Sequence, residues 1–239
     1  MFQIYLFLFI DENVVSWIFG NSSRTLDEVE ANLNVVLQTR IDLIARECDL
    51  TDKQRETLML AGQGDIHRFF NDYQTLRRKI PIGTISQQEY QEVWQDIQPV
   101  RTRYSAGLYN QSSLLEKTID YVLEDHQRSR YDAFVRERRQ RQYEAIVRGT
   151  LAMIENEMPL TSDQREKIVA LLMEDIPKAN YHNINYYHQY LVLYQLSMVP
   201  QQKLQAVLLE NEWESLGKLI QRFQGYKPSL IQNGVLIDD

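Results

Sequence analysis

Few residues in this chain have the types and spacing that catalysis requires. The four histidines are His67, His126, His182 and His188, and no His-Glu-x-x-His phrase places two of them on one helix face. The only cysteine, Cys48, can form no disulfide within the chain, and no sequence cue supplies a base for its thiol. The sequence therefore predicts neither a metal site nor a cofactor.

The glycine-rich stretch 61–65 superficially resembles a phosphate-binding loop. It reads Ala-Gly-Gln-Gly-Asp, and it lacks the lysine and the preceding strand that such a loop requires. No Gly-x-Ser-x-Gly phrase marks a nucleophilic serine, and no pair of acidic residues stands out as a general acid and base. We therefore expect a protein that is not an enzyme, with a local break or a close-packing point at 61–65.

The most informative pattern is a phrase that occurs twice. Residues 50–56 read LTDKQRE and residues 160–166 read LTSDQRE, so that five of the seven positions are identical. In each copy the threonine is a good helix N-cap, and the glutamine three residues later can complete a capping box. The candidate motif residues are therefore Leu50, Thr51, Gln54, Leu160, Thr161 and Gln164.

Two weaker copies lie between and after the strong ones. Residues 123–127 keep the leucine and the glutamine, and residues 198–202, which read MVPQQ, keep an apolar residue and the glutamine. A single copy would indicate only a helix cap, because such caps occur in many unrelated helical proteins. The alternation of strong and weak copies predicts two related units in tandem.

The Leu-Thr-x-x-Gln phrase resembles the signature of the Spy/CpxP-like group of bacterial periplasmic proteins. Leu50, Thr51 and Gln54 match it fully, as do Leu160, Thr161 and Gln164. The resemblance implies a small all-helical protein of the periplasm, or one otherwise exported, that acts as an ATP-independent chaperone or as a stress or metal sensor. It also implies a cradle-like homodimer. The chain differs from the group in being longer and acidic and in its predicted duplication.

The apolar periodicity predicts an all-α protein of long antiparallel helices. Glycine and proline, which punctuate tight turns, number only 9 and 6 among 239 residues. Pro99 should kink the helix that contains it, and Pro200 should occupy the first position of a last long helix. The expected helices cover residues 25–48, 51–80, 86–109, 114–122, 125–157, 161–176, 186–196 and 200–223.

These helices fall into two units. We expect unit boundaries at 25–145 and 146–226, followed by a tail at 227–239 whose apolar residues 235–237 either dock or hang free. Residues 1–24 form an apolar N-terminal segment with nine apolar residues in its first ten. That segment reads either as a remnant of an export signal or as a short stretch that packs on the body. Its apolar run is too short to span a bilayer, and no later stretch is long and apolar enough to do so.

Two clusters could form an interaction surface. Seven arginines but only three acids lie between residues 128 and 148, and Arg138, Arg139 and Arg141 are central among them. Such a run could bind an anionic partner or could simply form the solvated face of a long helix. Tyr187, Tyr190 and Tyr194 share one helix face, either as core residues or as a recognition surface.

Taken together, these patterns predict a non-enzymatic, chaperone-like protein that binds a protein partner or an unfolded client. The net charge of −7 argues against a nucleic-acid-coating protein. The alternatives are a stress or metal sensor that acts through the tyrosine and histidine segment, and a helical scaffold that contacts nucleic acid through the arginine run.

Overall fold

A computed structural model describes residues 13–20, 25–81, 86–181 and 184–237 of the chain. These residues form eleven helices and no strand, which confirms the expected all-α class. No helix in these ranges is long and apolar enough to cross a bilayer. The helices, in chain order, are α1 (Asn13–Phe19), α2 (Leu26–Cys48), α3 (Asp52–Lys79), α4 (Gln87–Ala106), α5 (Leu114–Val122), α6 (Asp125–Ile154), α7 (Ser162–Met173), α8 (Tyr186–Met198), α9 (Gln201–Gln205), α10 (Glu210–Gln221) and α11 (Lys227–Gln232).

The chain divides into two compact units, residues 1–133 and 134–239. The sequence places this boundary at 145/146, which lies further along α6. The structural division follows the change in packing partners along that helix. Tyr131 donates a hydrogen bond to Glu116 in unit 1, whereas Tyr143 belongs to the hydrophobic core of unit 2.

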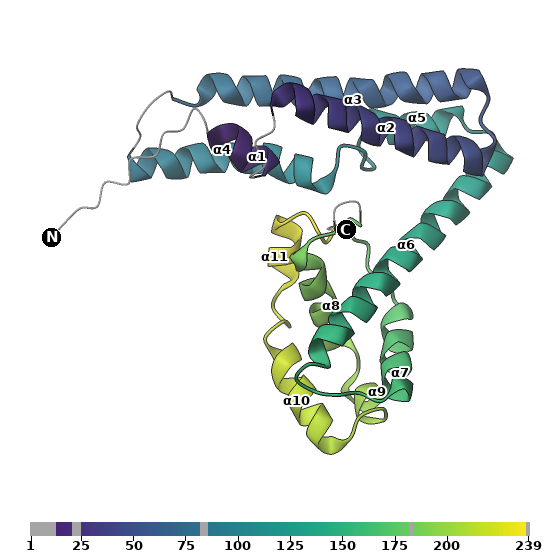
Figure 1. The fold of residues 1–239 in the computed structure, drawn as a ribbon, viewed down its shortest axis with the longest axis vertical. Coiled ribbons are helices and arrows are strands. Elements are labelled where there is room, and N and C mark those ends of the chain that lie inside the picture. Colours follow the sequence, from purple (N-terminus) through teal and green to yellow (C-terminus); the bar gives the residue numbers. More distant parts are fainter. Residues whose placement is uncertain (1–12, 21–24, 82–85, 182–183, 238–239) are drawn as a thin grey trace. The chain divides into compact units, whose positions relative to one another are not determined.

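In unit 1, α2 and α3 form an antiparallel hairpin, α5 packs along α3, and α1 packs against α4 (Figure 1). The glycines at 62 and 64 do not break α3, which runs unbroken from 52 to 79. Gly62 is instead a close-packing point. A Cβ added there would lie 2.2 Å from the Cδ1 atom of the fully buried Leu37, so the glycine lets α2 approach α3 closely.

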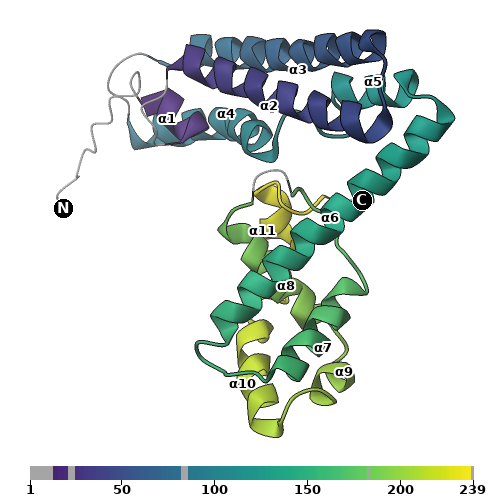
Figure 2. The ribbon, with the colours of Figure 1, turned by 45° about the vertical axis from the view of Figure 1, so that its right-hand side comes forward.

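In unit 2, α8 lies at the centre and packs against α7, α10 and α11 (Figure 2). Its buried face carries Leu191, Val192 and Leu196, and the same core includes Leu151 from α6 and Ile168 from α7. The expected tail also joins this unit. Residues 227–232 form α11, Val235 is buried, and the backbone N–H of Asn180 donates to the Val235 carbonyl at 2.7 Å.

The prediction of one long helix over 200–223 is wrong. The chain forms α9 and α10 with a turn between them, because Leu209 adopts an extended conformation (φ −68°, ψ 159°). The side chain of Glu212 then accepts a hydrogen bond from the Leu209 N–H at 2.8 Å, which starts a new helix. Pro200 lies at the N-cap of α9 rather than at its first helical position.

The apolar N-terminal segment falls partly outside the described residues, which begin at 13. Its described part forms α1, in which Val14, Ile18 and Phe19 are buried. The ring of Trp17 contacts the rings of Tyr90 and Trp94 of α4 at centroid distances of 5.7 and 6.3 Å. Residues 13–19 thus pack on the body of unit 1, whereas the strongly apolar residues 1–10, on which the two interpretations rest, lie outside the described residues.

Candidate functional site

The first strong motif copy forms a capping box at the start of α3. The backbone N–H of Gln54 donates to the Thr51 hydroxyl at 3.3 Å, and the Thr51 N–H donates to the Gln54 side-chain oxygen at 2.9 Å. Leu50 is half-buried beneath the turn that joins α2 to α3. This geometry confirms the predicted helix start and satisfies two backbone donors that the helix cannot pair internally.

The second strong copy repeats this geometry at the start of α7. Thr161 and Thr51 have the same backbone angles, φ −69° and ψ 158°. The Gln164 N–H donates to the Thr161 hydroxyl at 3.2 Å, and the Thr161 N–H donates to Gln164 Oε1 at 2.9 Å. The common ancestry of the two copies stays a prediction, whereas their common local geometry is observed.

In unit 1, the motif glutamine also joins α3 to the start of α6. Gln54 Nε2 donates to the Val122 carbonyl at 3.0 Å and to Gln127 Oε1 at 2.7 Å. Gln127 returns the interaction, because its own Nε2 donates to the carbonyl of Asp49 at 3.2 Å. The residues Leu123–Gln127, which the sequence singles out as a weak copy, are therefore the direct partner of the first strong copy.

In unit 2, the equivalent partner is not the one that the sequence suggests. Gln164 Nε2 donates to the Val207 carbonyl at 3.4 Å and to Glu212 Oε2 at 2.6 Å. Gln202, from the proposed weak copy at 198–202, is exposed on α9. The segment 208–212, which reads Leu-Leu-Glu-Asn-Glu, takes the place of that copy, and Glu212 bonds to Gln164 in place of a glutamine.

The motif residues thus serve the fold. Their side-chain groups are used in holding helix ends together, and each contact is made within one unit. The polar groups of the motif are therefore engaged within the fold, and the surface beside the motif is the better candidate for a binding site.

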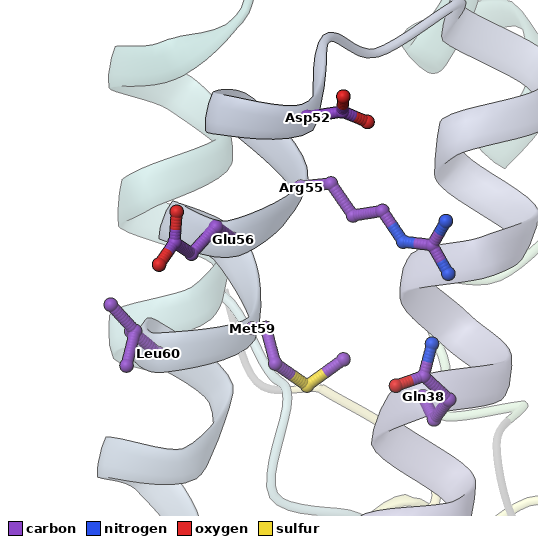
Figure 3. Close-up of a pocket in the computed structure, with 6 residues that line it drawn as sticks. All are labelled: Gln38, Asp52, Arg55, Glu56, Met59 and Leu60. Carbon is purple, nitrogen blue, oxygen red and sulfur yellow. The ribbon is translucent and has the colours of Figure 1, made fainter.

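A shallow groove of about 290 Å³ lies beside the first motif, between α2 and α3 (Figure 3). Gln38 lines it from α2, and the remaining lining residues, all from α3, are Asp52, Arg55, Glu56, Met59 and Leu60. The rim is charged, whereas Met59 and Leu60 give the groove an apolar side. The pairing of the two helices creates this groove, so that no single stretch of sequence predicts it.

The charged groups of the groove are held in place by neighbours on α2. The Arg55 guanidinium pairs with Asp42, whose carboxylate also accepts a hydrogen bond from Gln38 Nε2 at 2.9 Å. The apolar side of the groove is open, because Leu60 is 62% exposed.

Unit 1 also contains a buried polar network that sequence analysis did not detect. Asp65 is fully buried, and its two carboxylate oxygens accept the N–H groups of Leu114 and Leu115 at 2.9 and 2.8 Å. Glu116 pairs with Arg40. The only signal in the sequence is an acid on the otherwise apolar face of α3. Asp65 bonds to the backbone of α5 and Arg40 bonds to a side chain of the same helix, so that both groups position α5.

The arginine-rich part of α6 is largely paired with acids. Four of its seven arginines form ion pairs within the described residues: Arg128 with Asp120, Arg130 with Asp49, Arg141 with Glu137, and Arg148 with both Glu144 and Glu166. Arg138 and Arg139 are half-buried. This pairing supports the interpretation of the run as a solvated helix face rather than an anion-binding site.

Tyr187, Tyr190 and Tyr194 of α8 lie half-buried against the core of unit 2. Tyr187 and Tyr190 contact each other edge to face at 5.9 Å. His188, which is buried, caps the same helix: its Nδ1 accepts the Asn185 N–H at 3.1 Å and its Nε2 donates to the Asn180 carbonyl at 2.6 Å. Both ring nitrogens are thus used within the fold.

Within the described ranges, no group of three or more His, Cys, Asp or Glu side chains could hold a metal ion. Cys48 is fully buried at the end of α2, and burial raises the pKa of its thiol. A buried thiol of raised pKa is a poor nucleophile.

Comparison of the chain with family models, curated proteins and solved structures gives no match in any of the three. The resemblance to the Spy/CpxP-like group therefore depends on the motif residues alone and stays a prediction. The function has to be argued from the surfaces of the chain itself.

Proposed function

We propose that the protein is a non-enzymatic, chaperone-like binding protein that holds apolar segments of partner or partly unfolded proteins on its helices. The observation that carries this proposal is the open groove between α2 and α3, which is lined by the exposed Leu60. Following the family resemblance, we propose the bacterial cell envelope as its location.

The composition of the groove suits a loosely selective binder. Exposed aliphatic side chains offer apolar area to an unfolded segment, and the thioether of Met59 can adapt to different partners. The charged rim, made by Asp52, Arg55 and Glu56, keeps such a surface in solution when it is unoccupied. The capped turn at Thr51 fixes the angle between the two helices that form the groove.

Suppression of client aggregation tests this proposal. The full chain at equimolar ratio should reduce the light scattering of several chemically unfolded proteins. The variant Leu60→Lys should require several-fold more protein for the same effect, because it places a charge on the apolar side of the groove. Leu60 is exposed, so that far-UV circular dichroism should show an unchanged fold.

Tyr121→Lys is the matched control, because Tyr121 is 91% exposed and lies on α5 of the same unit, outside the residues that line the groove. It should suppress aggregation like the wild-type chain. Failure of the wild-type chain to protect any client would refute the chaperone function, and equal losses in both variants would refute the role of the groove.

A further inference from the structure

A second surface, in unit 2, has a different chemistry from the groove. Five partly exposed rings gather where the start of α8 meets the segment between α10 and α11, and we call them the aromatic patch: Tyr186, Tyr187, Tyr190, Phe223 and Tyr226. Tyr190 is central. Its ring lies 5.5 Å from that of Phe223 and 5.4 Å from that of Tyr226.

Three rings of the patch, those of Tyr187, Tyr190 and Phe223, pack partly against the core of unit 2, and the patch is most open at Tyr186. The buried face of α8 carries Leu191, Val192 and Leu196, whereas Tyr186 is 56% exposed. Ile184, which precedes it, is 52% exposed. Four of the five rings are tyrosines, which combine a large apolar area with a hydroxyl that can hydrogen-bond, and tyrosine is for this reason enriched in protein interfaces.

The sequence beside the patch is basic, unlike that of the whole chain, which carries a net charge of −7. Residues 176–209 and 215–237, which contain the whole patch, include no acid, and the acids between these ranges lie at positions 210, 212 and 214 of α10. Lys218, Arg222 and Lys227 lie beside it in sequence; all three are exposed, and none forms an ion pair within the described residues. Lys218 and Arg222 are four residues apart and therefore share one side at the end of α10.

We propose that the aromatic patch binds an acidic, extended segment of a partner protein. Carboxylates of that segment would pair with Lys218, Arg222 and Lys227, and its apolar side chains would lie against the rings. Unpaired cations beside exposed aromatics are the combination by which proteins recognise acidic motifs. The surface goes beyond the groove of unit 1, which selects apolar segments.

The ring geometry favours a peptide over a single-stranded nucleic acid. Nucleic acids stack their bases on open ring faces and need a basic groove that follows the backbone. In the patch, Tyr190 meets Tyr186 at an interplanar angle of 83° and Tyr226 at 72°, so that edges are directed at ring faces within the patch. Three cations are also few for a phosphate chain.

Fluorescence anisotropy tests the proposal with a labelled peptide of repeated Asp-Glu-Gly-Phe units and a neutral counterpart of repeated Asn-Gln-Gly-Phe units. The full chain should bind the acidic peptide at least about tenfold more tightly than the neutral one at low salt, and the difference should shrink as salt screens the charges. Equal binding of both peptides would overturn the proposal.

Charge-reversed variants locate the site. Arg222→Glu plus Lys227→Glu should weaken binding of the acidic peptide about tenfold, and Tyr186→Ser should weaken it severalfold. The matched control, Lys53→Glu plus Arg68→Glu, changes the net charge equally on exposed cations of unit 1 and should leave binding near the wild-type value. Equal loss in both double variants would refute the location.

Two further outcomes decide between the proposals. Tighter binding of oligo(dT), in competition with the acidic peptide, would replace the acidic partner with a nucleic acid and overturn the inference. Suppression of client aggregation should persist in Arg222→Glu plus Lys227→Glu, because the groove of unit 1 is unchanged. The aromatic patch can therefore fail while the chaperone proposal stands, and the reverse also holds.

Discussion

Each unit begins a helix with the same capped turn, but the side chain that bonds to the motif glutamine differs between the two units. In unit 1 the motif glutamine meets a second glutamine, and each side chain donates to the backbone beside the other. In unit 2, Gln164 meets Glu212, whose carboxylate can only accept. The helix cap is thus the part of the motif that both units share, whereas the long-range contact of the glutamine tolerates a change of partner.

The units also differ in which side chain accepts hydrogen bonds from the backbone N–H groups at the start of a helix. Unit 1 uses a buried carboxylate, Asp65, to cap α5 from a neighbouring helix. Unit 2 uses a buried imidazole, His188, to cap its own helix α8. Variants that remove or exchange such side chains test whether each one stabilises only its own unit. Hydrogen exchange measured on individual peptides distinguishes the stability of unit 1 from that of unit 2.

The largest effect is expected from Asp65→Ala. The substitution leaves two backbone N–H groups of α5 buried without an acceptor, which should lower the free energy of unfolding of unit 1 by about 3 kcal/mol. Amides of α5 should exchange faster, while those of unit 2 keep their protection. Asp65→Asn is the matched control, since it keeps the shape and one acceptor oxygen and should lose roughly half as much. Equal protection in all three proteins would show that the cap is dispensable.

Substitutions of glycine by alanine should have opposite signs in the two units. Gly62→Ala places a methyl group against the buried Leu37 and should destabilise unit 1 by about 1–2 kcal/mol, despite the better helix propensity of alanine. Gly149→Ala, on α6 in unit 2, meets no atom within 4 Å and should stabilise that unit by about 0.5–1 kcal/mol. Denaturation of the full chain, followed by circular dichroism and hydrogen exchange, measures both; a stabilising Gly62→Ala would contradict the close-packing interpretation.

Gln127→Glu makes the contact of unit 1 resemble that of unit 2. It keeps the acceptor for Gln54 but removes the donor to the Asp49 carbonyl, so that a loss of about 1 kcal/mol is expected in the free energy of unfolding. The reverse change, Glu212→Gln, adds a donor and removes a charge from the start of α10, and it should stay within about 0.5 kcal/mol of the wild type. A neutral Gln127→Glu would mean that the return hydrogen bond contributes nothing.

The smallest effect should come from Leu209→Thr. Leu209 is the N-cap of α10, is 64% exposed, and has no side-chain acceptor for the helix. Threonine would complete a capping box with Glu212 and should stabilise unit 2 by up to about 1 kcal/mol. Thr161→Ala removes the same interaction from α7 and should cost a similar amount. An unchanged midpoint of thermal unfolding in both would show that the caps are redundant.

Features set by neighbouring residues could be predicted from the sequence. The capping boxes at Thr51 and Thr161 and the helix over 114–122 involve residues three or four apart, and the structure confirms them. Features set by distant residues could not. The turn before Leu209, the helix α1 and the partner of Gln164 depend on tertiary contacts that no local pattern encodes, and the groove exists only because α2 packs on α3.

The single buried cysteine gives unit 1 a built-in kinetic reporter. Cys48 is fully enclosed, and burial raises the pKa of its thiol, so that a thiol reagent can modify only molecules in which unit 1 has opened. Unit 2 has no cysteine. The rate at which the reagent labels the native chain therefore measures the opening of unit 1 alone. The measurement needs no engineered probe and can be made while a client or a peptide is bound.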